Sequence, residues 1–127
     1  MSQAIIYRTA TPEDELTLSV LAMQVFLDTY ATNGVNIDLA KEASSVYSPG
    51  AIQQRLQRPG VEITVATTSE YMVGFLDLDS TTECPVSSVQ GLEVLRLYVQ
   101  APFQRSGVGK ALMALAESKA LERRAQH

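Results

Sequence analysis

The chain has 127 residues, which is enough for one domain with a single hydrophobic core and too few for two. Its 46% hydrophobic and 19% charged residues exclude an intrinsically disordered chain. A net charge of −4, without patches that interleave basic and aromatic residues, argues against nucleic-acid binding. No run approaches the roughly 18 apolar residues of a membrane-spanning helix, and residues 1–3 do not resemble the start of a secretory signal, so we expect neither a membrane protein nor a secreted one.

Cysteine and histidine each occur once. Cys84 alone cannot form an intramolecular disulfide, and a chain with a single cysteine fits a reducing compartment such as the cytoplasm. It lies beside Pro85 in a polar stretch, and a surface thiol is a simpler interpretation than a catalytic one, because no histidine near it in the sequence could activate it. The single histidine is His127, the last residue, so we expect no histidine-based catalytic triad. The carboxylates are scattered and lack metal-ligand spacing, so we expect no metal.

The first half of the chain predicts a strand followed by helices. Residues 4–8 form a short strand, and Thr11 caps a helix that runs from Pro12 to about Ala31. Apolar residues at intervals of three and four predict the face of this helix that packs on a sheet: Leu16, Val20, Met23, Leu27 and Tyr30. Asp38 could cap a second helix through about Tyr47, and Ser48-Pro49 would start a third, Gly50 to Arg58, which Pro59-Gly60 would end.

The second half predicts three strands and a closing helix. Val61 to Thr67 alternates and is rich in β-branched residues, and Tyr71 to Leu78 would return as its antiparallel partner. Gly74 in this partner marks a bulge or a point of close approach. A polar loop over residues 79–91 leads to a third strand, Leu92 to Val99, and the helix would run from Lys110 to about Arg124.

Charge is unevenly distributed along the chain. Residues 1–92 carry 4 basic and 11 acidic residues, whereas residues 93–127 carry 6 basic and 3 acidic ones, which gives net charges of −7 and +3. If the acidic part lines a substrate entrance, it would attract a cation such as an amine, although simple solubility explains it as well.

The stretch between the third strand and the last helix predicts a phosphate site. Glycines permit positive φ angles and close backbone approach, and the N–H groups of a helix's first turn attract anions. Arg105 and Lys110 add positive charges to this turn. The pattern is not a Walker loop, because Ala111 follows Lys110 and Gln104 stands where the first glycine would be. It is not the GxGxxG dinucleotide fingerprint either, because Leu112 replaces the third glycine.

The pattern that fits is (Q/R)xxGx(G/A), here Gln104-Arg105-Ser106-Gly107-Val108-Gly109 after the strand end Leu97-Tyr98-Val99. With these residues and the upstream order of elements, the chain resembles the GNAT superfamily of acyl-CoA-dependent N-acetyltransferases from Ile5 to its last residue. The alternative is an ordinary strand-to-helix turn of small residues. The resemblance implies an α/β (α+β) fold in which residues 1–127 form one domain, with a mixed, mainly antiparallel sheet and helices on both faces.

The resemblance also implies a function, the transfer of acetyl from acetyl-CoA to an amine of a small or amino-acid-like acceptor. The backbone of Leu97, Tyr98 and Val99 would pair with pantetheine, and the N–H groups from Arg105 to Lys110 would bind the pyrophosphate. The Val99 amide would polarise the thioester carbonyl, and Glu93 is the candidate base, acting directly or through water, unless it is a solvent-facing glutamate at the strand end. Phe26, Tyr30 and Tyr47 could wall the acceptor pocket, but each is more simply explained by core packing.

The chain departs from the resembled family at its C-terminal end. Family members continue with a fifth strand that forms half of the cleft and a helix that usually supplies a tyrosine acid, whereas the last tyrosine here is Tyr98. The Leu92–Val99 strand would be an exposed edge. Three explanations are open: a truncated chain, a dimer in which each copy covers the other's edge, or a domain completed by another polypeptide. Our hypothesis is self-association through this edge. Three functions stay open: an acetyltransferase, a weak or inactive CoA-binding module, and an unrelated phosphate-binding or structural domain.

Overall fold

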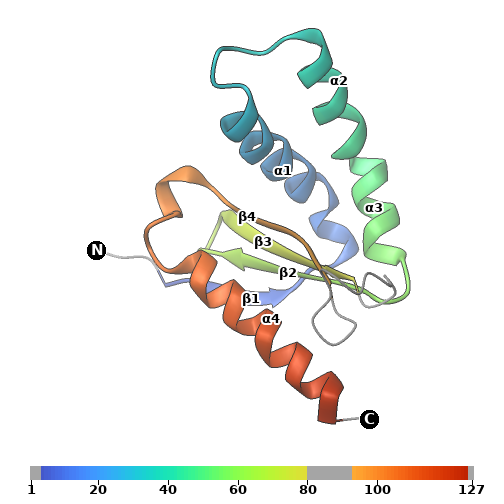
Figure 1. Cartoon of the computed structure of the whole chain (residues 1–127), viewed down its shortest axis with the longest axis vertical. Coiled ribbons are helices and arrows are strands. Elements are labelled where there is room, and N and C mark those ends of the chain that lie inside the picture. The colour runs from blue at the N-terminus through green and yellow to red at the C-terminus, as the bar shows by residue number, and fades with distance from the viewer. Residues whose placement is uncertain (1–3, 80–92, 126–127) are drawn as a thin grey trace.

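The computed structural model of the chain describes residues 4–79 and 93–125, and within them the side chains other than those of residues 93–95, 120 and 123–125. Figure 1 shows the elements in the order predicted from the sequence. They are β1 (Ile6–Thr9), the 3-10 helix η1 (Pro12–Asp14), α1 (Glu15–Tyr30), α2 (Ile37–Val46), α3 (Pro49–Gln57), β2 (Val61–Thr67), β3 (Met72–Asp79), β4 (Glu93–Val99), the 3-10 helix η2 (Ala101–Phe103) and α4 (Val108–Ala125). Cys84 lies outside the described residues.

The four strands form one antiparallel sheet in the order β1-β2-β3-β4. Helices α1, α2 and α3 lie on one side of this sheet and α4 lies on the other (Figure 1). The predicted architecture, a mainly antiparallel sheet with helices on both faces, is therefore confirmed for the described residues. A short hairpin joins β2 to β3, whereas the connection from β1 to β2 contains η1, α1, α2 and α3.

Alternation along the strands divides the buried side chains into two layers. Phe75 of β3 and Val65 of β2 belong to the layer under α1, α2 and α3, together with Leu18 and Phe26. The intervening strand residues belong to the layer under α4, where Leu112 is fully buried. Burying a large apolar side chain stabilises the fold by about 1.5–3 kcal/mol, so each layer anchors its helix firmly.

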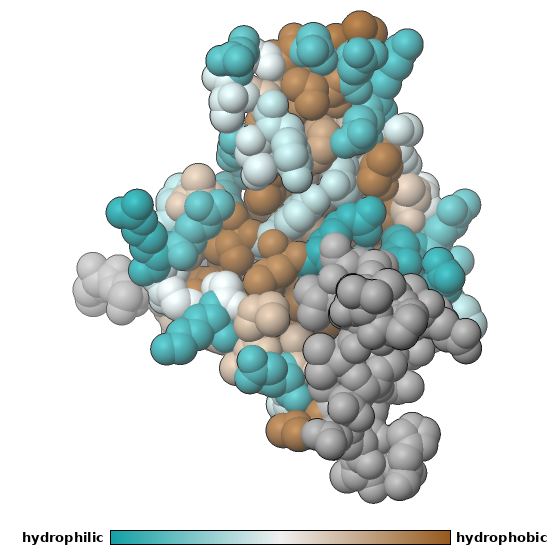
Figure 2. Space-filling model, viewed as in Figure 1, coloured by the Kyte–Doolittle hydropathy of each residue, from teal (hydrophilic) through white to brown (hydrophobic). Residues whose placement is uncertain are grey.

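The predicted apolar stripe of α1 is wrong at three of its five residues. Leu16, Val20 and Tyr30 are 64%, 57% and 64% exposed, whereas Met23 and Leu27 are partly buried against the core. The buried face consists of Leu18, Ser19, Leu21, Ala22, Val25 and Phe26. Figure 2 shows hydrophobic residues exposed among hydrophilic ones over the layer of α1, α2 and α3. Apolar residues occur on almost every side of α1, so spacing alone fits two different stripes. The sheet selects the stripe that includes Ser19 and Ala22, because small side chains let the helix approach closely.

Helix starts differ from the predicted ones by a few residues. The side chain of Asn36, not Asp38, caps α2 by accepting the Leu39 N–H at 2.9 Å. For α3, the predicted start at Ser48-Pro49 is confirmed, because Ser48 accepts the Ala51 N–H at 3.1 Å and the helix begins at Pro49. The residues after Thr11 form η1 before α1 begins, and α4 begins at Val108 rather than Lys110. No helix in the described part of the chain is long and apolar enough to span a bilayer.

Candidate functional site

The C-terminal end of β4 presents an outer edge of backbone groups. Its inner edge pairs with β3, with Val99 opposite Gly74 and Leu97 opposite Leu76. The Gln100 N–H continues this ladder by donating to the Val73 carbonyl at 2.8 Å. Backbone groups alternate in direction along an antiparallel strand, so those of Leu97 and Val99 point away from β3. Within the described residues no strand pairs with that side.

Gly74 allows β3 and β4 to approach closely at this point. A Cβ atom on Gly74 would lie 2.9 Å from the Tyr98 carbonyl oxygen and 3.5 Å from a methyl of Val108. No ordinary side chain fits at that distance from backbone. The register of β3 against β2 also shifts beside it, between Ala66 and Thr67. The predicted bulge or close approach at Gly74 is therefore confirmed, and it fixes β4 against the start of α4.

A tight turn connects β4 to α4. Gly107 has a φ of 89°, a conformation that glycine adopts without strain, and its carbonyl accepts the first helical bond, from the Ala111 N–H at 2.9 Å. The N–H groups of Gly109 and Lys110 precede that bond and have no intrahelical acceptor. The side chain of Val108 is buried in the core beneath them. The turn therefore aims backbone donors and the positive end of the helix dipole outward.

The remaining side chains of this turn take two different roles. The Gln104 side-chain amide donates to the outward Val99 carbonyl at 3.0 Å, which ties the turn to the outer edge of β4. The Ser106 hydroxyl donates to the Phe103 carbonyl at 2.7 Å and closes the turn. Arg105 and Lys110 are exposed. The side chains of Arg105 and Lys110 could therefore contact an anion that is bound to the free N–H groups.

A pocket of about 390 Å³ adjoins the outer edge of β4. It brings together residues that lie far apart in the sequence: Val25, Phe26, Thr29 and Tyr30 of α1, Leu97, Tyr98 and Val99 of β4, and Gln104 of the turn. The predicted acceptor residues Phe26 and Tyr30 therefore share a pocket with the predicted donor residues. Phe26 is also part of the core, as its alternative interpretation requires, whereas Tyr30 is 64% exposed.

Tyr47 lies behind this pocket and contacts Tyr98. The two hydroxyl oxygens are 2.6 Å apart, and the Tyr47 side chain is buried. The Tyr47 ring also lies 5.5 Å from that of Phe26 and 6.0 Å from that of Tyr98, centroid to centroid. Burial, and then the hydrogen bond with Tyr47, raise the pKa of the Tyr98 phenol, so Tyr98 stays neutral over the physiological pH range. Tyr47 is therefore part of the core, and its hydroxyl holds that of Tyr98, which lines the pocket.

A charged network next to the tyrosines was not predicted from the sequence. Asp77 is buried on β3 and accepts from Arg55 at 2.7 Å and from Arg96 at 3.2 Å. Arg55 also contacts buried Asp79 at 3.4 Å, and the Arg96 guanidinium lies 5.3 Å from the Tyr47 ring centroid. The signal in the sequence was the alternation of aspartates with apolar residues at the end of β3, since buried carboxylates require cationic partners.

Glu93 lies at the other end of β4 from Val99. It is the first residue of the strand and pairs with Asp79, and its side chain lies outside the described ones. Six residues of extended strand span about 20 Å. A base at Glu93 is therefore out of direct reach of an amine near Val99, and a proton could pass between them only along a chain of several waters. In the described part of the chain, no three potential metal ligands lie together.

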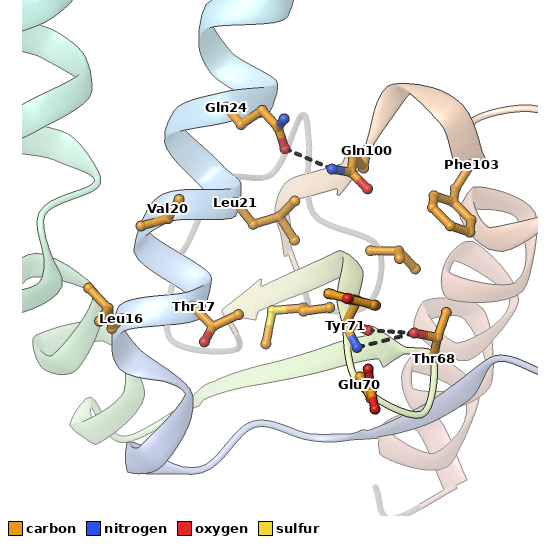
Figure 3. A pocket seen from close by; sticks show the side chains of 12 residues that line it. Leu16, Thr17, Val20, Leu21, Gln24, Thr68, Glu70, Tyr71, Gln100 and Phe103 are labelled. Atoms are coloured by element: carbon orange, nitrogen blue, oxygen red, sulfur yellow. Dashed lines mark hydrogen bonds between the residues drawn. The ribbon is translucent and has the colours of Figure 1, made fainter.

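A larger groove of about 490 Å³ lies elsewhere, between α1 and the start of β3. Figure 3 shows that Leu16, Val20 and Tyr71 border it and that a hydrogen bond between Gln24 and Gln100 lies at one end. It contains none of the glycine-turn residues. Size therefore favours this groove, but backbone donors and positive charge favour the smaller pocket beside β4 as the functional site.

Residues 26–127 match the family model described as an acetyltransferase (GNAT) domain. The chain is 26% identical over 103 residues to an uncharacterized N-acetyltransferase in the pepI 3′ region of Lactobacillus delbrueckii subsp. lactis, and the match covers 80% of this chain and 60% of that protein. It resembles the crystal structure of paiA N-acetyltransferase from Thermoplasma acidophilum in complex with coenzyme A, with a TM-score of 0.78 and 22% identity over 94% of this chain and 74% of that one. It also resembles an aminoglycoside N-acetyltransferase in complex with CoA, with a TM-score of 0.68 and 13% identity over 97% and 73% of the two chains.

The outward edge of β4, the glycine turn and the N-terminus of α4 thus occur in a fold shared with N-acetyltransferases. Since the family model matches most of its length, this chain belongs to the GNAT acetyltransferase family. The chain spans 60% of the length of the curated relative that it matches, and about three quarters of the two solved structures.

Proposed function

We propose that this chain is an acetyltransferase domain that moves acetyl from acetyl-CoA to a primary amine of a small or amino-acid-like molecule. The observation that carries the proposal is the continuity between the outward backbone groups of Leu97 and Val99 and the free N–H groups at the start of α4. An extended pantetheine arm can pair with the first, while a pyrophosphate binds the second. Each charge-assisted bond to the pyrophosphate would contribute about 1.5–3 kcal/mol.

The reaction follows from this placement. The neutral amine attacks the thioester carbonyl, a C–N bond forms, the C–S bond breaks, and coenzyme A leaves as a thiolate. The Val99 N–H, at the outward edge of β4, would donate to the carbonyl oxygen as it gains negative charge. The amine proton passes to water, from which a chain of several waters could carry it to Glu93, and the thiolate takes a proton from solvent. No step requires a metal.

A second candidate function, a CoA-binding module with little or no turnover, is favoured by a specific observation. Within the described residues, β4 has no neighbour on its outer side, so these residues line only one side of a bound pantetheine arm. Such a module would bind CoA but would not acetylate amines. Incubation with acetyl-CoA and an amine, with the released thiol measured, separates the two functions, and binding without thiol release would support the module.

The same unpaired edge supports a proposal about assembly. Exposed strand edges pair readily with other strands, and β4 has apolar neighbours on both of its faces. We propose self-association through this edge, in which a second copy would compete with pantetheine for the outer groups of Leu97 and Val99. Sedimentation of the chain as a monomer at micromolar concentration would contradict it. A small-molecule amine is the other proposed partner, and the single cysteine supports the cytoplasm as the compartment.

A further inference from the structure

The pocket beside β4 is walled by aromatic rings that form a continuous series. The rings of Tyr30 and Phe26 lie 5.2 Å apart, centroid to centroid, and Tyr47 and Tyr98 continue the series at 5.5 and 6.0 Å. Phe26, Tyr30 and Tyr98 line the pocket. Ring faces carry partial negative charge, so such a wall attracts an organic cation without needing a carboxylate.

The rings already hold one cation inside the protein. The Arg96 guanidinium lies over the Tyr47 ring, 5.3 Å from its centroid, while it also contacts Asp77. One ring of the series, that of Tyr47, therefore already contacts a cation behind the pocket. Phe26 and Tyr30 line the pocket, so an ammonium there would lie beside their rings.

Tyr98 lines the pocket and carries a hydroxyl that can accept a bond from a ligand able to reach it. Its hydroxyl is held at 2.6 Å by that of Tyr47, and a phenol oxygen can accept as well as donate. Whichever of the two hydroxyls donates, the Tyr98 oxygen keeps a lone pair that can accept an N–H bond. Because burial raises the pKa of Tyr98, this oxygen belongs to a neutral phenol and adds no formal charge.

The described lining of the pocket is uncharged throughout: Val25, Phe26, Thr29, Tyr30, Leu97, Tyr98, Val99 and Gln104. One ammonium can be stabilised there by ring faces and a single oxygen. A second or third ammonium would lose its hydration without gaining an ionic partner, which is unfavourable in a largely apolar pocket. The hydrocarbon body of an amine, by contrast, gains contact with Val25, Phe26 and Leu97.

We propose that the pocket beside β4 selects, as acceptor, an amine with one positive charge and an apolar or aromatic body, and that it disfavours polycations. This inference rests on the proposed function and names the acceptor class of the same site. Tyr98 acts as a positioning residue for the ammonium, and Tyr47 holds Tyr98 in place. Phe26 and Tyr30 supply the ring faces.

The test is a set of calorimetric titrations, with and without saturating CoA, so that binding is measured in the absence of turnover. The ligands are 2-phenylethylamine, its uncharged analogue 2-phenylethanol, and the polycation spermidine. We expect phenylethylamine to bind at least ten-fold more tightly than either of the others. Spermidine binding as tightly as phenylethylamine, or phenylethanol doing so, would overturn the proposal.

Two matched variants locate the effect. Tyr98→Phe keeps the ring and removes the oxygen, and we expect a several-fold weaker affinity for phenylethylamine. Tyr71→Phe makes the same change on a tyrosine that is 66% exposed and lies outside this pocket, and it should leave this affinity unchanged. Unchanged phenylethylamine binding in Tyr98→Phe would overturn the role of Tyr98.

The two levels of inference fail in different ways. No CoA binding, together with selective binding of phenylethylamine, would contradict the proposed acetyltransferase and leave the aromatic amine site supported. Normal CoA binding with a preference for spermidine would contradict the amine site alone.

Discussion

The side-chain amide of Gln104 donates to the backbone carbonyl of Val99 at 3.0 Å, so the first residue of the glycine turn is tied to the last residue of β4. This bond joins the two parts of the proposed donor site, the strand edge for pantetheine and the turn for pyrophosphate. It also uses one of the two lone pairs of the Val99 carbonyl, which leaves the other for a ligand.

Replacing Gln104 with alanine should therefore loosen the turn relative to β4. We expect the Kd for CoA to rise about three- to ten-fold, because a typical hydrogen bond contributes about 0.5–1.5 kcal/mol. Isothermal titration calorimetry measures the change. Gln53→Ala, on the exposed surface of α3, is the control and should bind CoA like the unmodified chain. Equal affinity in both variants would contradict a role for this bond in binding.

Gly109 offers a sharper test of the turn. A Cβ atom there would approach nothing closer than a methyl of Val99 at 3.7 Å, an ordinary contact, so the backbone tolerates a side chain. Gly109→Glu should abolish measurable CoA binding, because it places a negative charge where the pyrophosphate would lie. The circular dichroism spectrum and melting temperature should change little.

Gly109→Ala is the matched control for this position. It adds the same Cβ without charge, and alanine is favoured over glycine inside a helix by about 1 kcal/mol. We expect equal or higher stability and CoA affinity reduced much less than in Gly109→Glu. If both variants bind CoA normally, the pyrophosphate site lies elsewhere on the molecule.

Gly74 should be far less tolerant of substitution. Gly74→Ala would place a Cβ 2.9 Å from the Tyr98 carbonyl oxygen, and we expect it to lower the free energy of unfolding by about 1–3 kcal/mol. Urea denaturation followed by circular dichroism measures it. Gly50→Ala, in α3, meets nothing within 4 Å and should be neutral or slightly stabilising. Equal stability of the two variants would show that β3 and β4 are not so closely packed.

The pairing of Arg8 with Asp14 predicts a pH dependence of stability. Arg8 donates two bonds to the Asp14 carboxylate, at 2.8 and 2.9 Å, and the Thr11 N–H donates a third at 2.8 Å. The hydrogen bonds from Arg8 are the main cause that lowers the pKa of Asp14 below its ordinary value of 3.8. A carboxyl group with a lowered pKa in the folded state stabilises the protein above its unfolded pKa, and this stabilisation disappears as the pH falls through the folded pKa.

Arg8→Gln should accordingly be less stable than the unmodified chain by about 0.5–1 kcal/mol near neutral pH, a modest value because Arg8 is partly exposed to solvent. The difference should shrink as the pH falls below about 4. Urea denaturation of both proteins at a series of pH values measures it. A difference that persists unchanged in acid would show that the contact is not ionic in origin.

The sequence predicted the order of the elements because each carries a local signal. Val61–Thr67 matches β2 residue for residue, since β-branched alternation and the flanking Pro59-Gly60 define both of its ends. The phosphate turn was also predictable, because its glycines and charges are consecutive. The buried face of α1 was not, because choosing between two apolar stripes requires the sheet against which the helix packs.

The side-chain network behind the pocket was beyond sequence reasoning for a related reason. Tyr47 and Tyr98 are 51 positions apart, and Arg55 and Asp77 are 22 positions apart. Contacts of this range depend on the register of β3 with β4 and on how α2 and α3 cross the sheet. The sequence identified the two tyrosines as candidates for different roles, and the fold joins them by a hydrogen bond.

The measurement that tests the central claim most directly is calorimetric titration of the chain with acetyl-CoA, with acetylated pantetheine that lacks the pyrophosphate as the comparison. We predict a one-to-one complex with acetyl-CoA that weakens at least ten-fold with the pantetheine compound, and a loss of this difference in Gly109→Glu. Equal binding of the two compounds, or no binding of acetyl-CoA to the unmodified chain, would contradict a donor site on the outer edge of β4 and the glycine turn.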